Sequence, residues 1–208
     1  AAIFFFKYNV TGADSFCFTI LGGTFTLITV YLVLGQAFNI VGILCVPFLT
    51  RRLGKKNTFG GAMACATILS VVFYFLATDM IAEILIMQVL ISFCAGIVSP
   101  LMWSMYADIA DYSETGRRAT GLIFSSSSMS QKLGWTIGGS MTGWLLFYFG
   151  FEANVPQTES SLQGIMLMMS LLPACATFIS MLFILKYPLT EKKMNEIVKS
   201  LMQKREGV

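Results

Sequence analysis

The segment TFTLITVYLVLGQAFNIVGILCVPFL, from Thr24 to Leu49, decides the fold class. It contains no charged residue and is longer than the roughly 20 apolar residues that a helix needs to cross a bilayer. Similar apolar spans follow at residues 58–77, 84–106 and 164–185. The whole chain of 208 residues is 56% hydrophobic and 12% charged, and its mean hydropathy is +0.73. These values predict an all-α integral membrane protein, and they exclude a soluble enzyme, a disulfide-stapled secreted domain and a nucleic-acid binder.

One further span, at residues 122–149, is unusually rich in glycine, serine and threonine. Before the first full span, residues 1–6 provide only about 9 Å of helix, too little to cross the bilayer. We therefore expect five full crossings and one truncated crossing. Residues 1–187 are predicted to form one transmembrane bundle, and residues 188–208 a polar, basic tail. Three crossings followed by three more suggest half of a larger transporter built from inverted repeats.

The basic residues predict the orientation. Twelve of the fourteen Lys and Arg residues fall on one side of the predicted membrane, in the 51–56 turn, the 107–118 loop and the tail, whereas Lys7 is on the other side and Lys132 lies within a span. Positive charge collects on the cytoplasmic side, so the C-terminus is predicted to be cytoplasmic.

Catalysis is improbable for this composition. The chain has no histidine, which excludes a Ser-His-Asp triad and the usual zinc sites. Its five cysteines are scattered, mostly within apolar runs, and fit small packing residues. A membrane-embedded enzyme would also need paired carboxylates inside the spans, and none is present. We expect no enzyme, no bound metal and no organic cofactor.

Lys132 is the most informative residue, because a cation deep in a span costs about 2.5 to 3.5 kcal/mol. Spacings of three and four place it on one stripe with Ser125, Ser128, Gly139 and either Trp135 or Thr136. Such a stripe should face the bundle interior or a water-filled cavity, where Lys132 binds substrate or couples an ion. The alternative is a structural lysine paired with a carboxylate.

Three further residues are candidate ligands for a sugar. Gln36 and Asn39 lie three residues apart in the first full span, and their amides could bind hydroxyl groups or bridge neighbouring helices. Trp135 offers an apolar face to a pyranose ring, although core packing explains it equally well. The glycines of the same span repeat as G-x-x-x-G, which favours close helix packing; they are Gly134, Gly138, Gly139 and Gly143.

Opposite charges on two predicted cytoplasmic loops form a candidate gate. The acidic members are Asp108 and Asp111, and the basic members are Arg51, Arg52, Arg117 and Arg118. Ion pairs between these loops would close the cytoplasmic side, whereas the alternative is a solvated loop with weak pairs. In the tail, Met194, Ile197, Val198, Leu201 and Met202 share one stripe flanked by lysines, which predicts an interfacial helix.

Three motifs, in this order, are FFFKYNVTGAD from Phe4, YADIADYSETGRRATG from Tyr106 and FSSSSMSQKLGW from Phe124. Together they resemble the glycoside-pentoside-hexuronide:cation symporters, the melibiose-permease-like members of the major facilitator superfamily. The resemblance covers nearly the whole chain and identifies it with the C-terminal six-helix bundle, from the end of the seventh helix through the twelfth. Members resembling this chain usually carry two additional residues between Glu114 and Thr115.

The resemblance implies symport of a glycoside, pentoside or hexuronide with Na⁺ or H⁺ by alternating access, in a bacterial inner membrane. Lys132 falls on the family's intramembrane lysine near the sugar and cation sites, and Arg118 on the loop arginine of cytoplasmic closure. The family's cation-binding carboxylates lie in the N-terminal half, so we expect this chain alone to be inactive and its partners to be that half, the sugar and the bilayer. The alternative is a stand-alone small membrane protein, either a homodimeric carrier or an assembly factor.

Overall fold

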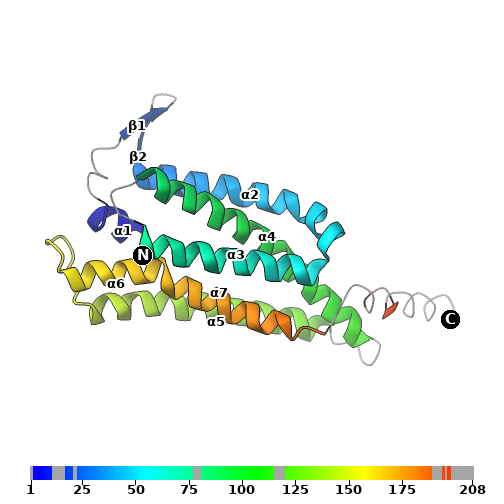
Figure 1. Ribbon diagram of the computed structural model, residues 1–208. Coiled ribbons are helices and arrows are strands. Elements are labelled where there is room, and N and C mark those ends of the chain that lie inside the picture. The colour runs from blue at the N-terminus through cyan, green and yellow to red at the C-terminus, as the bar shows by residue number, and fades with distance from the viewer. Residues whose placement is uncertain are drawn as a thin grey trace.

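The computed structural model describes residues 2–10, 17–20, 23–76, 81–114, 120–188, 194, 196 and 197. In the described residues the fold is helical, with one small hairpin (Figure 1). The helices are α1 (Ala2–Tyr8), α2 (Leu27–Leu53), α3 (Lys55–Phe75), α4 (Ile81–Glu114), α5 (Thr120–Tyr148), α6 (Glu159–Met169) and α7 (Leu171–Leu185), and the strands are β1 (Cys17–Ile20) and β2 (Gly23–Thr26). The predicted helical membrane fold is confirmed, and the antiparallel β1–β2 hairpin is an addition that the sequence analysis did not anticipate.

Four helical segments are long and apolar enough to cross a membrane. They are Leu27–Leu53, Lys55–Phe75, Ile81–Ser113 and Glu159–Leu185. Helix α5 has 29 residues, which is also long enough to cross, but its many small and polar residues keep it out of this group. The short α1 has seven residues.

The turn expected at residues 51–56 is smaller in the structure than predicted. Arg51 and Arg52 lie in the last turn of α2, and Lys55 begins α3, so Gly54 alone separates the two helices. Gly54 has a φ of 82°, a left-handed value that a residue with a Cβ adopts only with strain. This glycine is what allows two membrane-spanning helices to reverse direction in so short a connection.

The loop predicted at residues 107–118 is wrong over most of its length. Helix α4 continues through the charged segment to Glu114, so Asp108 and Asp111 are helical residues. Their spacing is compatible with a helix, and the charge that suggested a loop is tolerated because this end of α4 lies beyond its apolar stretch. Residues 115–119 are outside the described part of the chain.

The last span is broken in two at Ser170. Pro173 has no N–H to donate to the carbonyl of the residue four positions earlier, and the break between α6 and α7 lies one turn before it. At the break, the backbone N and the Oγ of Ser170 both donate to Met166 O, at 3.1 and 2.6 Å, and so close the last turn of α6. The sequence analysis noted the proline of this span as part of one continuous crossing, and the structure shows that the helix is interrupted between Met169 and Leu171.

The tightest helix pair is α2 and α4, and glycine makes it possible. A Cβ on Gly42 would collide with Phe93 O, and one on Gly96 with Asn39 O. The two backbones therefore approach as closely as glycine permits, as in other membrane helix pairs with small residues at the contact. Buried side chains of α3 and α4 form an adjoining cluster, among them Phe59, Ile97 and Leu101.

At the end of the bundle where the chain begins, α1 contacts the connection between α5 and α6. The Lys7 ammonium donates to Asn154 Oδ1 at 2.8 Å, and Asn154 N donates to the Tyr8 hydroxyl at 2.9 Å. The Phe151 ring packs edge-on against Phe4 and Tyr8. We call this the α1 end, and we call the opposite end, with Arg51, Arg52, Lys55, Lys56 and Lys186, the basic end (Figure 1).

Of the tail, Pro188, Met194, Glu196 and Ile197 are described, and the last three have a helical backbone. The interfacial helix predicted for residues 188–208 otherwise lies outside the described residues. It stays a prediction.

Candidate functional site

Helix α5 lies at one edge of the bundle and α2 at the opposite edge (Figure 1). No residue of α5 is buried in this chain. Its contacts are at its two ends: the Phe124 ring stacks on Trp103 of α4, and Leu146 packs against the cluster that includes Phe5 and Ile165. Between these contacts, residues 132–141 are exposed throughout. The middle of α5 is therefore available to something other than the described residues.

Helical spacing divides the surface of α5 into different faces. One is apolar and includes Leu122, Met129, Leu133 and Ile137, which suits lipid. Beside it runs a polar stripe, which we define as Ser125, Ser128, Lys132, Thr136, Gly139 and Gly143. A helix of this kind needs a polar neighbour on one side, because polar groups facing hydrocarbon are costly.

Lys132 is exposed in the centre of the polar stripe. Within the described part of the chain it makes no ion pair, since the ion pair found there joins Lys55 to Asp108. The hydroxyl groups around it are satisfied within the helix: Thr136 Oγ1 donates to Lys132 O at 3.0 Å, and Ser125 Oγ to Gly121 O at 2.7 Å. Ser128 is half-buried. The ammonium is thus the charged group of the stripe, and it has no ion-pair partner in the described residues.

Trp135 is 71% exposed and lies one turn from Lys132. Core packing against this chain therefore does not explain it. The glycines of α5 also lack the packing partners that G-x-x-x-G predicts, because no described atom comes within 4 Å of a Cβ built on Gly134, Gly138, Gly139 or Gly143. Gly139 and Gly143 therefore leave the polar stripe without a packing partner among the described residues, and Gly134 and Gly138 do the same on another face of α5.

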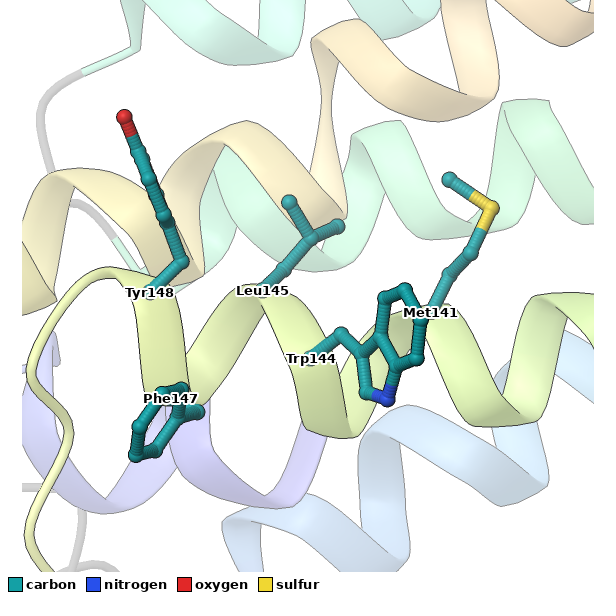
Figure 2. Close-up of a pocket in the computed structure, with 5 residues that line it drawn as sticks. All are labelled: Met141, Trp144, Leu145, Phe147 and Tyr148. Carbon is teal, nitrogen blue, oxygen red and sulfur yellow. The ribbon is translucent and has the colours of Figure 1, made fainter.

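A surface hollow of about 540 Å³ lies along the last turns of α5. All five lining residues come from α5. Figure 2 shows Tyr148 and Leu145 pointing to one side of this helix and Phe147 to the other side. The lining is aromatic and aliphatic, with Met141 and Trp144 completing it. It lacks the converging polar groups of a sugar site and fits lipid contact instead.

Asn39 and Gln36 are placed differently from each other. The Asn39 amide nitrogen donates to Ser92 O on α4 at 3.3 Å, which fits the bridging alternative. Gln36 is exposed on α2, away from the α4 contact. The structure does not bring either residue to the polar stripe, which lies at the opposite edge of the bundle (Figure 1).

At the basic end, Asp108 is held by a residue that the gate hypothesis did not include. Lys55 Nζ donates to both carboxylate oxygens of Asp108 at 2.8 Å, linking the start of α3 to the end of α4. The Asp108 side chain is 14% exposed and that of Lys55 35%. The sequence places Lys55 directly after the turn glycine, next to three other cations. Only the packing of α3 against α4 shows that Lys55, and not one of those neighbours, binds Asp108.

The other members of the gate hypothesis do not meet in the described residues. Arg51 and Arg52 are exposed, and the Arg52 guanidinium lies 4.6 Å from the centre of the Phe48 ring. Asp111 is half-buried on α4. Arg117 and Arg118 lie outside the described residues. The gate therefore stays a prediction, with Asp108 engaged by Lys55.

A second lysine and a tyrosine complete this cluster. Lys56 Nζ donates to the carbonyl oxygens of Leu185 and Tyr187 at 2.9 and 2.8 Å, so it caps the C-terminal end of α7. The Tyr187 hydroxyl is buried without a hydrogen-bond partner among the described residues. Burial, and then the charge of Asp108, raises the pKa of Tyr187 to about 12. Lys55, Lys56, Asp108 and Tyr187 thus tie α3, α4 and α7 together at the basic end.

Comparison with known families assigns this chain to a protein family. The model of the MFS/sugar transport protein family matches residues 3–191, which is nearly the whole chain. The chain belongs to this family. Its place is in the sugar/cation symporter group, whose members are transporters and not enzymes, as the sequence motifs indicated.

Named relatives agree with this assignment. The chain is 34% identical to the glucuronide carrier protein homolog of Escherichia coli over 77% of this chain and 36% of the relative. It is 31% identical to the isoprimeverose transporter of Lactiplantibacillus pentosus over 78% of this chain and 32% of that protein. With the inner membrane symporter YicJ of Escherichia coli the identity is 26%, over 92% of this chain and 43% of the relative. The chain therefore spans between about a third and a half of the length of these relatives.

Within this family's fold, the polar stripe of α5 and the cluster at the basic end are the two groups of polar and charged side chains described above. The stripe carries a lysine in the middle of α5, and the cluster carries an ion pair between helix ends. They lie at different depths, since Lys132 is 12 residues into α5, which begins at the basic end.

Proposed function

We propose that this chain is the C-terminal half of a symporter that moves a glycoside, pentoside or hexuronide together with Na⁺ or H⁺ by alternating access. The observation that carries the proposal is Lys132: an ammonium in the middle of a helix of membrane-spanning length, exposed and without an ion pair in the described residues. A cation in this position needs carboxylates or water, because hydrocarbon does not solvate it.

The missing N-terminal half is the proposed source of those carboxylates. The relatives named above are between two and three times as long as the matched region, so a second bundle of similar size fits their length. It would pack on the polar stripe of α5, where the glycines leave the helix surface open and no residue of the described chain covers it. The alternative, a second copy of this chain on the same face, would bring two ammonium groups together without an acidic partner from α5.

Coupling follows from electrostatics in such a cavity. A Na⁺ or H⁺ bound among carboxylates competes with Lys132 for the same negative charge, and the released ammonium and nearby hydroxyl groups can then hydrogen-bond the sugar. Trp135 would supply the apolar face against the ring. Sites for Gln36 and Asn39 in the sugar cavity are less well supported, since Asn39 already bridges α2 and α4.

We propose the cytoplasmic side for the basic end and for the C-terminus, since cations concentrate there. In this arrangement Asp111, Arg117 and Arg118 would form the cytoplasmic gate, and Arg51 and Arg52, which are exposed at the end of α2, would not take part in it. Lys55 and Asp108 would fix the helix ends on which that gate is built.

The test is Lys132→Leu in the intact transporter, with Leu133→Ala as the matched control on the neighbouring apolar face of α5. We expect Lys132→Leu to reduce cation-driven sugar accumulation by tenfold or more, about 1.4 kcal/mol or more of coupling, while membrane insertion is retained. Leu133→Ala should transport within twofold of wild type. Wild-type accumulation with unchanged ion dependence in Lys132→Leu would show that the lysine is structural.

A further inference from the structure

The four cations around Gly54 do not have equal partners. Lys55 is bound to Asp108, and Lys56 donates to the last carbonyls of α7. Arg51 and Arg52 are exposed, and neither forms an ion pair with a carboxylate of the described residues. Two guanidinium groups at the end of α2 therefore remain available to an anion.

Arg52 is also held in a defined position. Its guanidinium lies 4.6 Å from the centre of the Phe48 ring, one turn earlier on α2. A cation over an aromatic face is attracted by the ring, and this contact takes up none of the guanidinium N–H groups. Those N–H groups are the part of an arginine that binds phosphate oxygens in pairs.

An apolar stripe leads directly to these arginines. Spacings of three and four place Val33, Ala37, Ile40, Leu44 and Phe48 on one side of α2, in line with Arg51. All five are exposed, Leu44 to 73% and Phe48 to 58%. The stripe is on the opposite side of α2 from Gly35, Asn39 and Gly42, which face α4.

The side chains of this stripe are those of a lipid-facing surface. Helix contacts inside a membrane are enriched in small and polar residues, as the α4-facing side of α2 shows. The exposed stripe has large aliphatic and aromatic side chains instead, which suit acyl chains. Its charged end supplies the complement for an anionic headgroup.

We infer that Arg51, Arg52 and the exposed stripe of α2 form a binding site for an anionic phospholipid of the bilayer. The lipid phosphate binds the two guanidinium groups, and its acyl chains lie along Phe48, Leu44 and Ile40. This inference requires only that the chain spans a membrane, and it holds whether or not the protein couples a sugar to a cation.

Native mass spectrometry of the purified full-length protein tests the site. Phosphatidylglycerol is compared with phosphatidylcholine of the same acyl chains, in wild type, Arg52→Gln and the matched control Lys186→Gln, which removes another exposed cation at the basic end. Arg52→Gln should weaken phosphatidylglycerol binding about fivefold, the value of one basic residue near an anionic lipid, and leave phosphatidylcholine unchanged. Lys186→Gln should remain within twofold of wild type.

Two further measurements separate a lipid site from its alternatives. Leu44→Ser removes acyl contact without changing charge and should lower phosphatidylglycerol binding, whereas soluble glycerol phosphate should not displace the lipid. Equal binding of phosphatidylglycerol in wild type and Arg52→Gln overturns the inference and leaves the stripe to another protein surface. Displacement by glycerol phosphate at the lipid's own concentration also overturns it, because the site would then recognise the phosphate alone.

Discussion

The α2–α4 pair and helix α5 use the same residue type in opposite ways. Gly42 and Gly96 lie where two helix backbones touch, so that a single added Cβ would collide with a carbonyl oxygen. Gly138 and Gly139 of α5 have open space around them in the described structure. A glycine spacing therefore indicates a surface that can be approached closely, and it does not indicate which surface approaches.

The cations of the two regions differ in the same way. Lys55, beside the α2–α4 pair, has both oxygens of Asp108 as partners, whereas Lys132 of α5 has no ion pair in the described residues. In the first region the glycines and the cation have contact partners within the chain. In the second region the glycines and the ammonium have no such partners among the described residues. The α2–α4 pair therefore holds the bundle together, whereas the middle of α5 contributes no packing contact or ion pair within the described residues.

The largest effect is expected for Gly96→Ala. The added methyl group collides with Asn39 O, so the helices must separate, and we expect a loss of about 3 kcal/mol or failure to recover folded protein. Gly138→Ala is the matched variant on α5, and it should be neutral or stabilising by up to about 1 kcal/mol, because alanine favours helix. Denaturant unfolding in detergent, followed by circular dichroism, measures both.

Equal destabilisation by the two glycine variants would contradict the difference between α2–α4 and α5, since α5 would then have a packing partner inside this chain. Gly139→Leu in the intact transporter provides a second test, because Gly139 lies on the polar stripe with open space around it. We expect that variant to insert normally but to lose transport if the proposed second half packs on α5.

An intermediate effect is expected at the basic end. Lys55→Met leaves Asp108 without its partner, and Asp108→Asn leaves Lys55 without a charge to bind. Since the pair is partly exposed, a double-mutant cycle should give a coupling energy of about 1 kcal/mol. The same cycle between Lys56 and Asp108 is the control and should give a value near zero, because Lys56 binds carbonyl oxygens. A coupling that persists unchanged at high salt would show that packing, and not charge, joins the two residues.

The smallest effect is expected for Tyr187→Phe. The Tyr187 hydroxyl is buried without a partner in the described residues, so its removal should change stability at pH 7 by no more than about 0.5 kcal/mol. The folded pKa of Tyr187, about 12, is raised above the ordinary value near 10, so the protein loses this residue's contribution as pH rises from 10 to 12. Wild type should therefore lose stability over this interval more steeply than Tyr187→Phe. Identical alkaline unfolding curves would show that Tyr187 titrates normally.

Several elements follow from the sequence without further information. The length of the apolar run that begins at Thr24, the proline in the last span and the polar composition of α5 all act locally, through the bilayer thickness, the missing N–H of proline and the cost of polar groups in hydrocarbon. The sequence predicts a turn over residues 51–56, and in the structure Gly54 alone separates the two helices. The end of α4 is predicted wrongly as part of a loop, because its charges resemble those of a loop although Asp108 and Asp111 have helical spacing.

The sequence alone is sufficient to show that this chain is helical, is apolar enough for a membrane, resembles sugar transporters and carries Lys132 in the middle of a predicted span. Only the tertiary structure decided that Lys55 binds Asp108, that Asn39 bridges to Ser92 and that the glycines of α5 remain uncovered. The physical reason is that hydropathy and helix spacing depend on neighbours along the chain. The choice among several equivalent cations, amides or glycines depends on which helix face lies opposite, and residues far apart in the sequence set that together.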